Sequence, residues 1–143
     1  MAMSAGLLRG RRVLVVDDNA AVRTLVRQLF ALEPDFEIAG EAENGREAVE
    51  KAANLKPEIV ILDLAMPVMN GLDAAPELRK ILPEIKIILF TVEQGSEVDR
   101  LASQAGIDAV ILKDNAPRLI SQARLLLEPK EDESDSGELR NAS

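Results

Sequence analysis

The sequence predicts a single α/β domain in which a parallel β-sheet is covered by helices on both faces. Two observations favour this class. Short apolar segments alternate with segments of helical periodicity along the body of the chain. Several of the short segments are apolar at consecutive positions, which is typical of strands that are buried on both faces. A length of 143 residues fits one domain of ordinary size.

Five segments have the length and the Val, Ile and Leu content of buried strands. They are "RVLVVD" (12–17), "FEIAGEA" (36–42), "EIVILDL" (58–64), "IKIILFT" (85–91) and "DAVILK" (108–113). Right-handed crossovers between them place helices on both sides of the sheet. We therefore expect a flavodoxin-like, doubly wound (βα)5 fold with the strand order 2-1-3-4-5.

Helical patterns fill the intervals between these strands. We expect helices at 20–32, 45–55, 71–82, 95–105 and 116–127. Asn115 and Pro117 are predicted to cap and begin the last helix. The third helix contains Pro76, which removes a backbone donor. We therefore expect that helix to start late, near Ala75, or to kink, with an irregular first turn.

Composition excludes several kinds of site. The chain has no Cys and no His, so thiolate metal sites, disulfides and a phosphohistidine are excluded. A net charge of −8 argues against direct nucleic-acid binding. Because no apolar segment approaches the roughly 18–20 residues of a membrane span and no signal peptide is recognisable, we expect a cytoplasmic protein without membrane contact.

The two ends of the chain differ from its body. Residues 128–143 contain six acidic and two basic residues and no apolar stripe. We expect a flexible segment at 1–11, the folded domain at 12–127, and a disordered acidic tail or linker at 128–143.

Polar residues end four of the predicted strands. They are Asp17 and Asp18, Asp63, Thr91 and Lys113, while the second strand offers only Glu41 and Glu43, farther away. Ligands of open parallel sheets bind at the carboxyl ends of the strands, where the strand order reverses. We therefore expect the first five of these residues to converge at one edge of the sheet.

These residue types together suit phosphoryl chemistry. Three neighbouring aspartates cannot all stay ionised without a counter-charge, and Mg²⁺, or Mn²⁺ in its place, would supply one. Asp63 would be the nucleophile that accepts a phosphoryl group, while the cation and Lys113 neutralise the charge on its oxygens. Thr91 would offer a hydroxyl donor. Each residue alone also has a structural explanation, such as a helix N-cap for Asp17 or Asp18, so the hypothesis depends on their convergence.

The same residues carry a family resemblance. Four segments resemble the receiver domain of two-component response regulators: "VLVVDDN" (13–19), "IVILDLAMPVMNGL" (59–72), "ILFT" (88–91) and "VILKD" (110–114). The residues around them are similar to those of the LuxR/NarL subfamily. The resemblance covers about residues 12–127. It implies a phosphorylation site with a bound Mg²⁺ ion.

The resemblance assigns a role to each matching position. Asp63 is the phosphorylated residue; Asp17, Asp18, Asp63 and the backbone carbonyl of Ala65 bind the metal; Thr91, Lys113 and the backbone of Val92 contact the phosphoryl group and form the switch. Two positions depart from the family pattern. Val110 stands where an aromatic switch residue is common, and Asp114 stands where Pro commonly follows the lysine. The phosphorylation site itself is intact.

The resemblance also implies partners and leaves alternatives open. A histidine kinase would be the phosphodonor, and the output would pass to a downstream protein or to a covalently linked DNA-binding domain outside this chain. A homodimer is compatible with this class. Two other functions remain as alternatives: a phosphatase of the haloacid dehalogenase type, and a receiver-like module that binds partners without phosphorylation. Such a phosphatase needs a second Asp at the place of Ala65. We therefore expect a switch that at most dephosphorylates itself, not a turnover enzyme.

Overall fold

The computed structural model describes residues 10–128 and shows the predicted α/β fold. Five parallel strands form one sheet in the order β2-β1-β3-β4-β5. No helix in this part of the chain is long and apolar enough to cross a membrane. The terminal segments that we expected to be flexible or disordered lie almost wholly outside the described residues.

The elements alternate along the chain as predicted. Their bounds are β1 Arg11–Val16, α2 Ala20–Ala31, β2 Phe36–Ala42, α3 Gly45–Leu55, β3 Ile59–Leu62, α4 Gly71–Ile81, β4 Lys86–Thr91, α5 Ser96–Gln104, β5 Ala109–Leu112, a 3₁₀ turn Lys113–Asn115 and α6 Arg118–Leu127. Strand β2 has the predicted bounds, β1 begins and ends one residue earlier than predicted, and β3, β4 and β5 are shorter than the apolar segments that predicted them.

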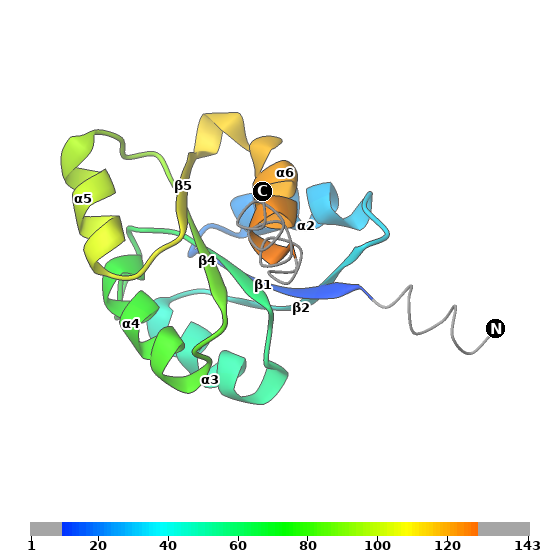
Figure 1. The fold of residues 1–143 in the computed structure, drawn as a ribbon, viewed down its shortest axis with the longest axis horizontal. Helices are drawn as coiled ribbons and strands as arrows, with labels where there is room; N and C mark the ends of the chain where they lie inside the picture. Colours follow the sequence, from blue (N-terminus) through cyan, green and yellow to red (C-terminus); the bar gives the residue numbers. More distant parts are fainter. Residues whose placement is uncertain (1–9, 129–143) are drawn as a thin grey trace, which may run out of the picture.

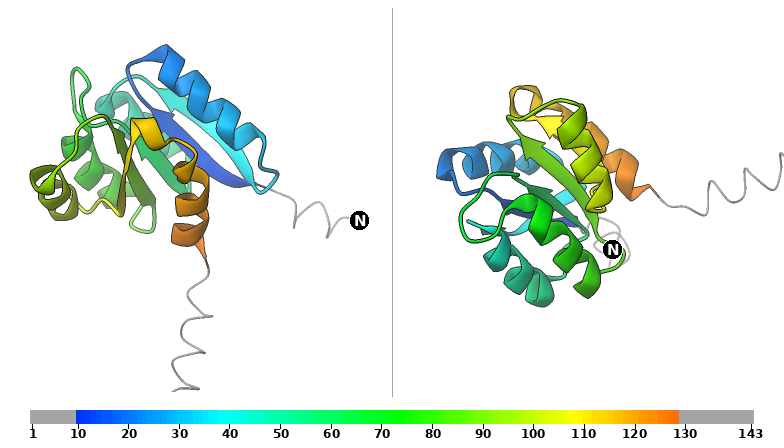
Figure 2. Two further views of the ribbon diagram at one scale, coloured as in Figure 1. Left: turned by 90° about the horizontal axis from the view of Figure 1, so that it is seen from above. Right: turned by 90° about the vertical axis from the view of Figure 1, so that its left-hand side faces the viewer.

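Helices cover the two faces of the sheet unequally (Figures 1 and 2). Alternate strand residues such as Leu14 and Leu62 pack against α3, α4 and α5. Their neighbours, such as Val15 and Ile61, pack against α2 and α6. The central strands are therefore buried on both sides, which is why they are apolar at consecutive positions.

Helix α4 does not start late, so the expectations of a start near Ala75 and of an irregular first turn are wrong. The helix begins at Gly71, and the side chain of Asn70 accepts a hydrogen bond from the Asp73 N–H at 2.8 Å, which gives a regular capped first turn. Pro76 lies on the exposed face of the helix. On that face water can bind the carbonyl group that the missing N–H leaves free, so the helix tolerates the proline.

The start of the last helix also differs from the prediction. Asn115 ends a 3₁₀ turn, and α6 begins at Arg118 with Pro117 directly before it and no side-chain cap. The peptide between Lys113 and Asp114 is trans, as are the other peptide bonds of residues 10–128. The chain therefore turns immediately after β5, which keeps Lys113 at the end of the sheet.

Glycine at position 71 allows α4 to approach the end of β3. A Cβ atom there would lie 2.2 Å from the carbonyl oxygen of Asp63 and 3.2 Å from the Cα of Leu64. The close approach lets the Gly71 N–H donate to the Leu64 carbonyl at 2.9 Å. The backbone around Asp63 is thus fixed by the first residue of α4.

We predict that Gly71→Ala destabilises the protein by about 2 kcal/mol or more, because the methyl group must displace the Asp63 backbone. Helix propensity alone predicts the opposite sign, a gain of about 0.5–1 kcal/mol. Urea unfolding measures the difference. Glu50→Ala, on the exposed face of α3, is the control and should change stability by less than about 0.5 kcal/mol. A Gly71→Ala variant as stable as the wild type would contradict the close approach.

Candidate functional site

The structure brings the predicted site residues to one end of the sheet. Asp17 and Asp18 directly follow β1, Asp63 directly follows β3, Thr91 is the last residue of β4, and Lys113 directly follows β5. The two strands that carry the acids are neighbours at the centre of the sheet. This is the point where the strand order reverses, and the site therefore lies where ligands of such folds bind.

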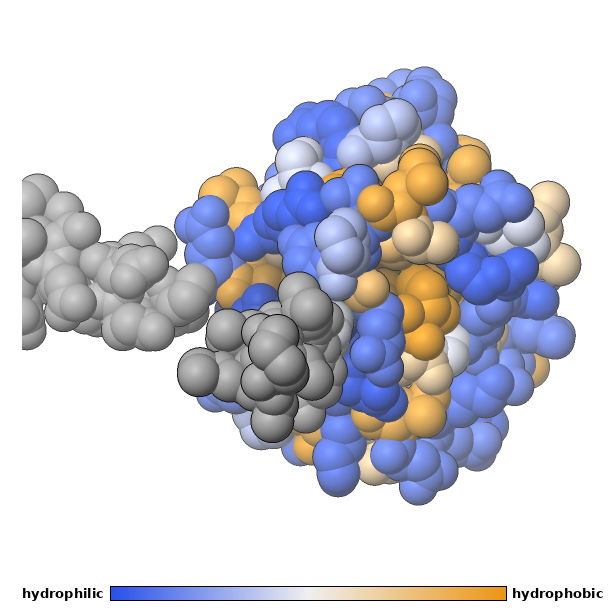
Figure 3. Space-filling model, turned by 90° about the vertical axis from the view of Figure 1, so that its right-hand side faces the viewer, coloured by the Kyte–Doolittle hydropathy of each residue, from blue (hydrophilic) through white to orange (hydrophobic). Residues whose placement is uncertain are grey.

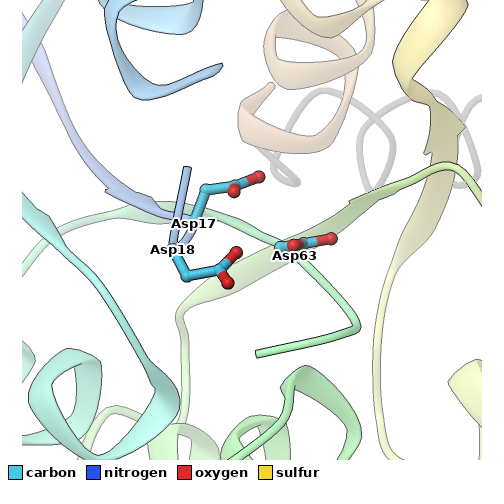
Figure 4. Close-up of side chains that lie close together, drawn as sticks. All are labelled: Asp17, Asp18 and Asp63. Atoms are coloured by element: carbon cyan, nitrogen blue, oxygen red, sulfur yellow. The ribbon is translucent and has the colours of Figure 1, made fainter. Parts of the chain in front are cut away.

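Three carboxylates converge there (Figure 4). One oxygen each of Asp17, Asp18 and Asp63 lies within 4.8 Å of the other two. Asp17 and Asp63 are only 2% and 5% exposed, whereas Asp18 is exposed. The two buried carboxylates receive little help from water, so the cluster requires positive charge.

Lys113 supplies part of that charge. Its ammonium nitrogen lies 2.8 Å from Oδ2 of Asp17 and 3.4 Å from Oδ2 of Asp63. Oδ2 of Asp17 is buried and receives no well-directed hydrogen bond from the described residues, so its contact with Lys113 is an ion pair. One ammonium group therefore faces two buried carboxylates.

The electrostatics of the cluster show that one cation is not enough. Burial, and then the negative charge of Asp17, raise the pKa of Asp63 to about 6 in spite of Lys113. Burial alone would lower the pKa of Lys113, but Asp17 and Asp63 outweigh it, and that pKa is raised. Lys113 therefore stays charged at neutral pH, while Asp63 ionises only at the cost of repulsion.

Neither Asp17 nor Asp18 is the N-cap of the following helix. The cap of α2 is Asn19, whose side chain accepts hydrogen bonds from the N–H groups of Ala21 and Val22. Oδ1 of Asp17 accepts from the Asn19 N–H at 2.9 Å, which orients the carboxylate. Asn19 therefore caps the helix in place of the two acids, and the carboxylates of Asp17 and Asp18 remain available for a ligand.

Among the described residues, the remaining predicted residues form no side-chain hydrogen bond or ion pair with the cluster. Thr91 is 1% exposed, and its Oγ1 accepts a hydrogen bond from the Glu93 N–H at 3.2 Å; among the described residues it makes none to Asp63 or Lys113. Val92 is 73% exposed, and Ala65 is also exposed. Val110 is half-buried and packs into the core on the side of α3, α4 and α5.

An open hollow of about 580 Å³ adjoins the acids. It is lined by Asp18, Leu64, Ala65, Met66, Pro67, Asn70 and Glu93. A more apolar hollow, lined by residues such as Pro57, Leu82 and Ile85, lies at the opposite end of the strands. Figure 3 shows that end of the molecule, where apolar residues form a band flanked by hydrophilic ones. Of the three clustered carboxylates, Asp18 lines the first hollow.

The donor set of the cluster fits a hard divalent cation. All three groups are carboxylates, which Mg²⁺ and Mn²⁺ prefer. Oδ2 of Asp17 is buried and its only close partner among the described residues is the ion pair with Lys113, while burial and the charge of Asp17 raise the pKa of Asp63. Residues Asp17, Asp18 and Asp63 could therefore hold such an ion, and the exposed position of Asp18 beside the hollow would let water complete its coordination.

Two residues close to the site were missed by the sequence analysis. Arg23 of α2 donates to the backbone carbonyl of Asp17 and pairs with Glu41 of β2. The sequence set Glu41 aside as too distant, and no motif marks Arg23. The only signal was their opposite charges, and a charge pattern alone does not show which helix face meets which strand end.

Comparisons with known proteins agree with the geometry. Residues 13–124 match the family described as "Response regulator receiver domain". The chemotaxis protein CheY of Thermotoga maritima is 43% identical over 114 residues, which cover 80% of this chain and 94% of CheY. The nitrate/nitrite response regulator protein NarL of Escherichia coli is 38% identical over 111 residues, which cover 78% of this chain and 51% of NarL.

A solved structure supports the same assignment. A DNA-binding response regulator of the LuxR family from Staphylococcus aureus superimposes with a TM-score of 0.75 and 30% identity, covering 81% of this chain and 98% of that one. This chain is thus similar to CheY over almost all of that protein, and to NarL over about half of it.

We predict a characteristic pH dependence for the metal-free protein. The pKa of Asp63 is raised from 3.8 to about 6 on folding. The folded state therefore holds a proton that the unfolded chain has lost, and the stabilisation present below about pH 4 disappears as the pH rises through 6. In EDTA at pH 7.5, Asp63→Asn should be more stable than the wild type by up to about 3 kcal/mol.

Chemical unfolding between pH 4 and pH 8 measures this difference. The advantage of Asp63→Asn should vanish near pH 4. Asp99→Asn, which removes an exposed carboxylate of α5, is the control and should show no such trend. A constant difference between Asp63→Asn and the wild type across this range would contradict the raised pKa.

Proposed function

The chain belongs to the response regulator receiver domain family, and from this premise we propose that it is a phosphoacceptor switch in which Asp63 takes the phosphoryl group from a histidine kinase. One observation carries the proposal: Asp63 is buried between a second carboxylate and the ammonium group of Lys113, and the next residue, Leu64, lines an open hollow. With a pKa of about 6, it is mostly ionised at pH 7.5 and can act as a nucleophile.

The transfer step needs little covalent chemistry from the protein. A carboxylate oxygen of Asp63 attacks the phosphorus of a phosphohistidine, an O–P bond forms, and the N–P bond breaks. The electron pair of that bond returns to the imidazole nitrogen, which then takes a proton from water. Lys113, 3.4 Å from Asp63, is placed to neutralise an oxygen of the incoming group.

Asp17, Asp18, Asp63 and the backbone carbonyl of Ala65 would hold Mg²⁺ or Mn²⁺ at this site. When bound, the cation would supply the positive charge that the three carboxylates lack and would neutralise phosphoryl oxygens. This chain's own residues contribute the rest. Asp17 is oriented by the Asn19 N–H, and the backbone of Asp63 is held by the Gly71 contact.

The switch would run through Thr91 and the loop 92–96. In the unphosphorylated protein the Thr91 hydroxyl accepts a hydrogen bond from its own loop, from the Glu93 N–H. Turning to an acceptor oxygen on phosphorylated Asp63 would release that bond and rearrange the loop, with the Val92 N–H as a second donor. Gly95, with a φ of 126°, forms the N-cap of α5, so α5 would move with the loop. Val110 has no ring, and the switch would work without an aromatic residue there.

The output would lie in a partner or in a further domain. The LuxR-family relative of known structure is a DNA-binding response regulator, and the match to NarL covers 51% of that protein. Control of transcription through a linked DNA-binding domain and signalling through a separate protein, with or without homodimerisation, are both compatible with this chain. We place the protein in the cytoplasm, where kinase and phosphodonor would meet it.

The family match favours this switch over the phosphatase alternative. The residue two positions after Asp63 is Ala65, which has no acidic group for general catalysis. The additional carboxylates come from the end of β1 instead. Sustained turnover of phosphomonoesters by the purified chain would reverse this preference, and an inert Asp63 would favour the non-phosphorylated module.

We predict that the chain gains one phosphoryl group when it is incubated with acetyl phosphate and Mg²⁺. Intact-mass measurement detects the gain, which should be absent in Asp63→Asn and in EDTA. Asp73→Asn, which changes an exposed acid in the first turn of α4, is the control and should be phosphorylated like the wild type. No gain in the wild type, or an equal gain in Asp63→Asn, would refute the assignment.

We also predict that Mg²⁺ raises the melting temperature. Binding to the folded state alone stabilises by RT ln(1 + [L]/Kd), or about 1.4 kcal/mol at ten times Kd, which corresponds to several degrees for a domain of this size. Asp17→Asn and Asp18→Asn should lose most of this shift, because each removes a charged ligand. Differential scanning fluorimetry with and without Mg²⁺ tests this, and a shift of equal size in both variants would contradict the assigned ligands.

A further inference from the structure

A largely buried arginine lies behind the acid pair. Arg23 is in the second turn of α2, and its side chain is only 15% exposed. Its Nη1 donates to the backbone carbonyl of Asp17 at 2.7 Å, and its Nε pairs with Oε1 of Glu41 at 3.0 Å. One guanidinium group therefore connects α2 with the end of β1 and with the edge strand β2.

The carbonyl that Arg23 binds belongs to the peptide between Asp17 and Asp18. A hydrogen bond to that oxygen fixes the orientation of the peptide plane, and so the direction in which the Asp18 side chain leaves the backbone. Within residues 10–128, the carboxylate of Asp18 has no hydrogen bond or ion pair of its own. Its position beside Asp17 and Asp63 (Figure 4) is thus set by the backbone.

Glu41, the ion-pair partner of Arg23, is itself held by two further basic residues. Oε2 of Glu41 pairs with Nη1 of Arg27 at 2.6 Å, and the Lys51 ammonium donates to the Glu41 backbone carbonyl. Burial alone would raise the pKa of Glu41, but hydrogen bonds from Arg27 and Arg23 outweigh it, so its pKa is lowered and the anion persists at neutral pH. Arg23 is therefore fixed on both sides.

We infer that Arg23 is a positioning residue for divalent-cation binding: it holds the Asp17–Asp18 peptide so that the exposed carboxylate of Asp18 joins the two buried ones. The inference rests on the proposed function, because it concerns the same cation site. The fork of a guanidinium group suits this task, since it donates to a carbonyl and to a carboxylate at once. A lysine can make only one of the two bonds well.

Positioning and simple electrostatics predict changes of opposite sign. Arg23 is a positive charge near a cation site, so its Coulomb effect opposes cation binding, and removing it should strengthen binding. If Arg23 orients Asp18, removing it should weaken binding instead. A merely structural role would lower the melting temperature and leave the affinity of the folded protein unchanged.

The experiment measures Mn²⁺ binding by the loss of the free-ion signal in electron paramagnetic resonance, with Mg²⁺ as competitor, well below the melting temperature. We expect Arg23→Gln to weaken binding about tenfold, the effect of losing one charge-assisted hydrogen bond. Arg23→Lys should recover part of the loss. Arg124→Gln is the control: it removes a guanidinium group that pairs with Glu33 and Asp35 but with neither Asp17 nor Glu41, and it should not weaken binding.

The outcomes separate this inference from the proposed function. Wild-type binding with equal or tighter binding by Arg23→Gln overturns the positioning role alone. A wild-type chain that binds neither ion overturns the cation site and the positioning role together. If Arg23→Gln does not fold, Arg23→Lys provides the test, because it keeps the positive charge and makes only one of the two bonds well. Electrostatics then predicts no change and positioning predicts a loss of about threefold, so unchanged binding in that variant overturns the role.

Discussion

Repulsion among the carboxylates of Asp17, Asp18 and Asp63 is the constraint on which the rest of this site depends. Two of the three are almost fully buried, and a single ammonium group, from Lys113, faces them. Burial first, and then the negative charge of Asp17, raise the pKa of Asp63 in spite of Lys113. Carboxylates that did not repel one another would gain less free energy from binding a cation or from accepting a phosphoryl group.

The fold limits this repulsion to the residues that directly follow two buried strands. Residues Val13–Val16 of β1 and Ile59–Leu62 of β3 are apolar and buried, and the carboxylates begin at the next residue. The flanking helices then hold the strand ends. Gly71 lets α4 touch the backbone of Asp63, and Asn19 caps α2 while orienting Asp17. The packing of helices on both faces of the sheet stabilises the fold, and the reactive groups lie at the carboxyl ends of the strands.

Positive charge is distributed around the cluster in two different ways. Lys113 reaches the carboxylates directly, from the end of β5. Arg23 binds the backbone carbonyl of Asp17 and none of the three carboxylates. Glu41 pairs with Arg23 and neutralises its charge. An arginine left unpaired at that place would compete with a cation. Pairing it with an edge-strand glutamate lets it support the backbone while its net field at the site is reduced.

The sequence by itself determined the fold class, the strand order and the residues that meet at the strand ends, because consecutive apolar residues report burial on both faces and parallel strands end at one edge. It mispredicted the starts of α4 and α6, because the exposure of Pro76 and the 3₁₀ turn at Lys113 depend on how each segment packs. Only the tertiary structure decided that Asn19, not an aspartate, caps α2, and that Arg23 and Glu41 support the acid pair. Asp17, Asp18 and Asn19 are consecutive residues that can each cap a helix, so the local pattern did not choose between them. The contacts of Arg23 and Glu41 join a helix face to neighbouring strand ends, and no periodicity along the chain encodes them.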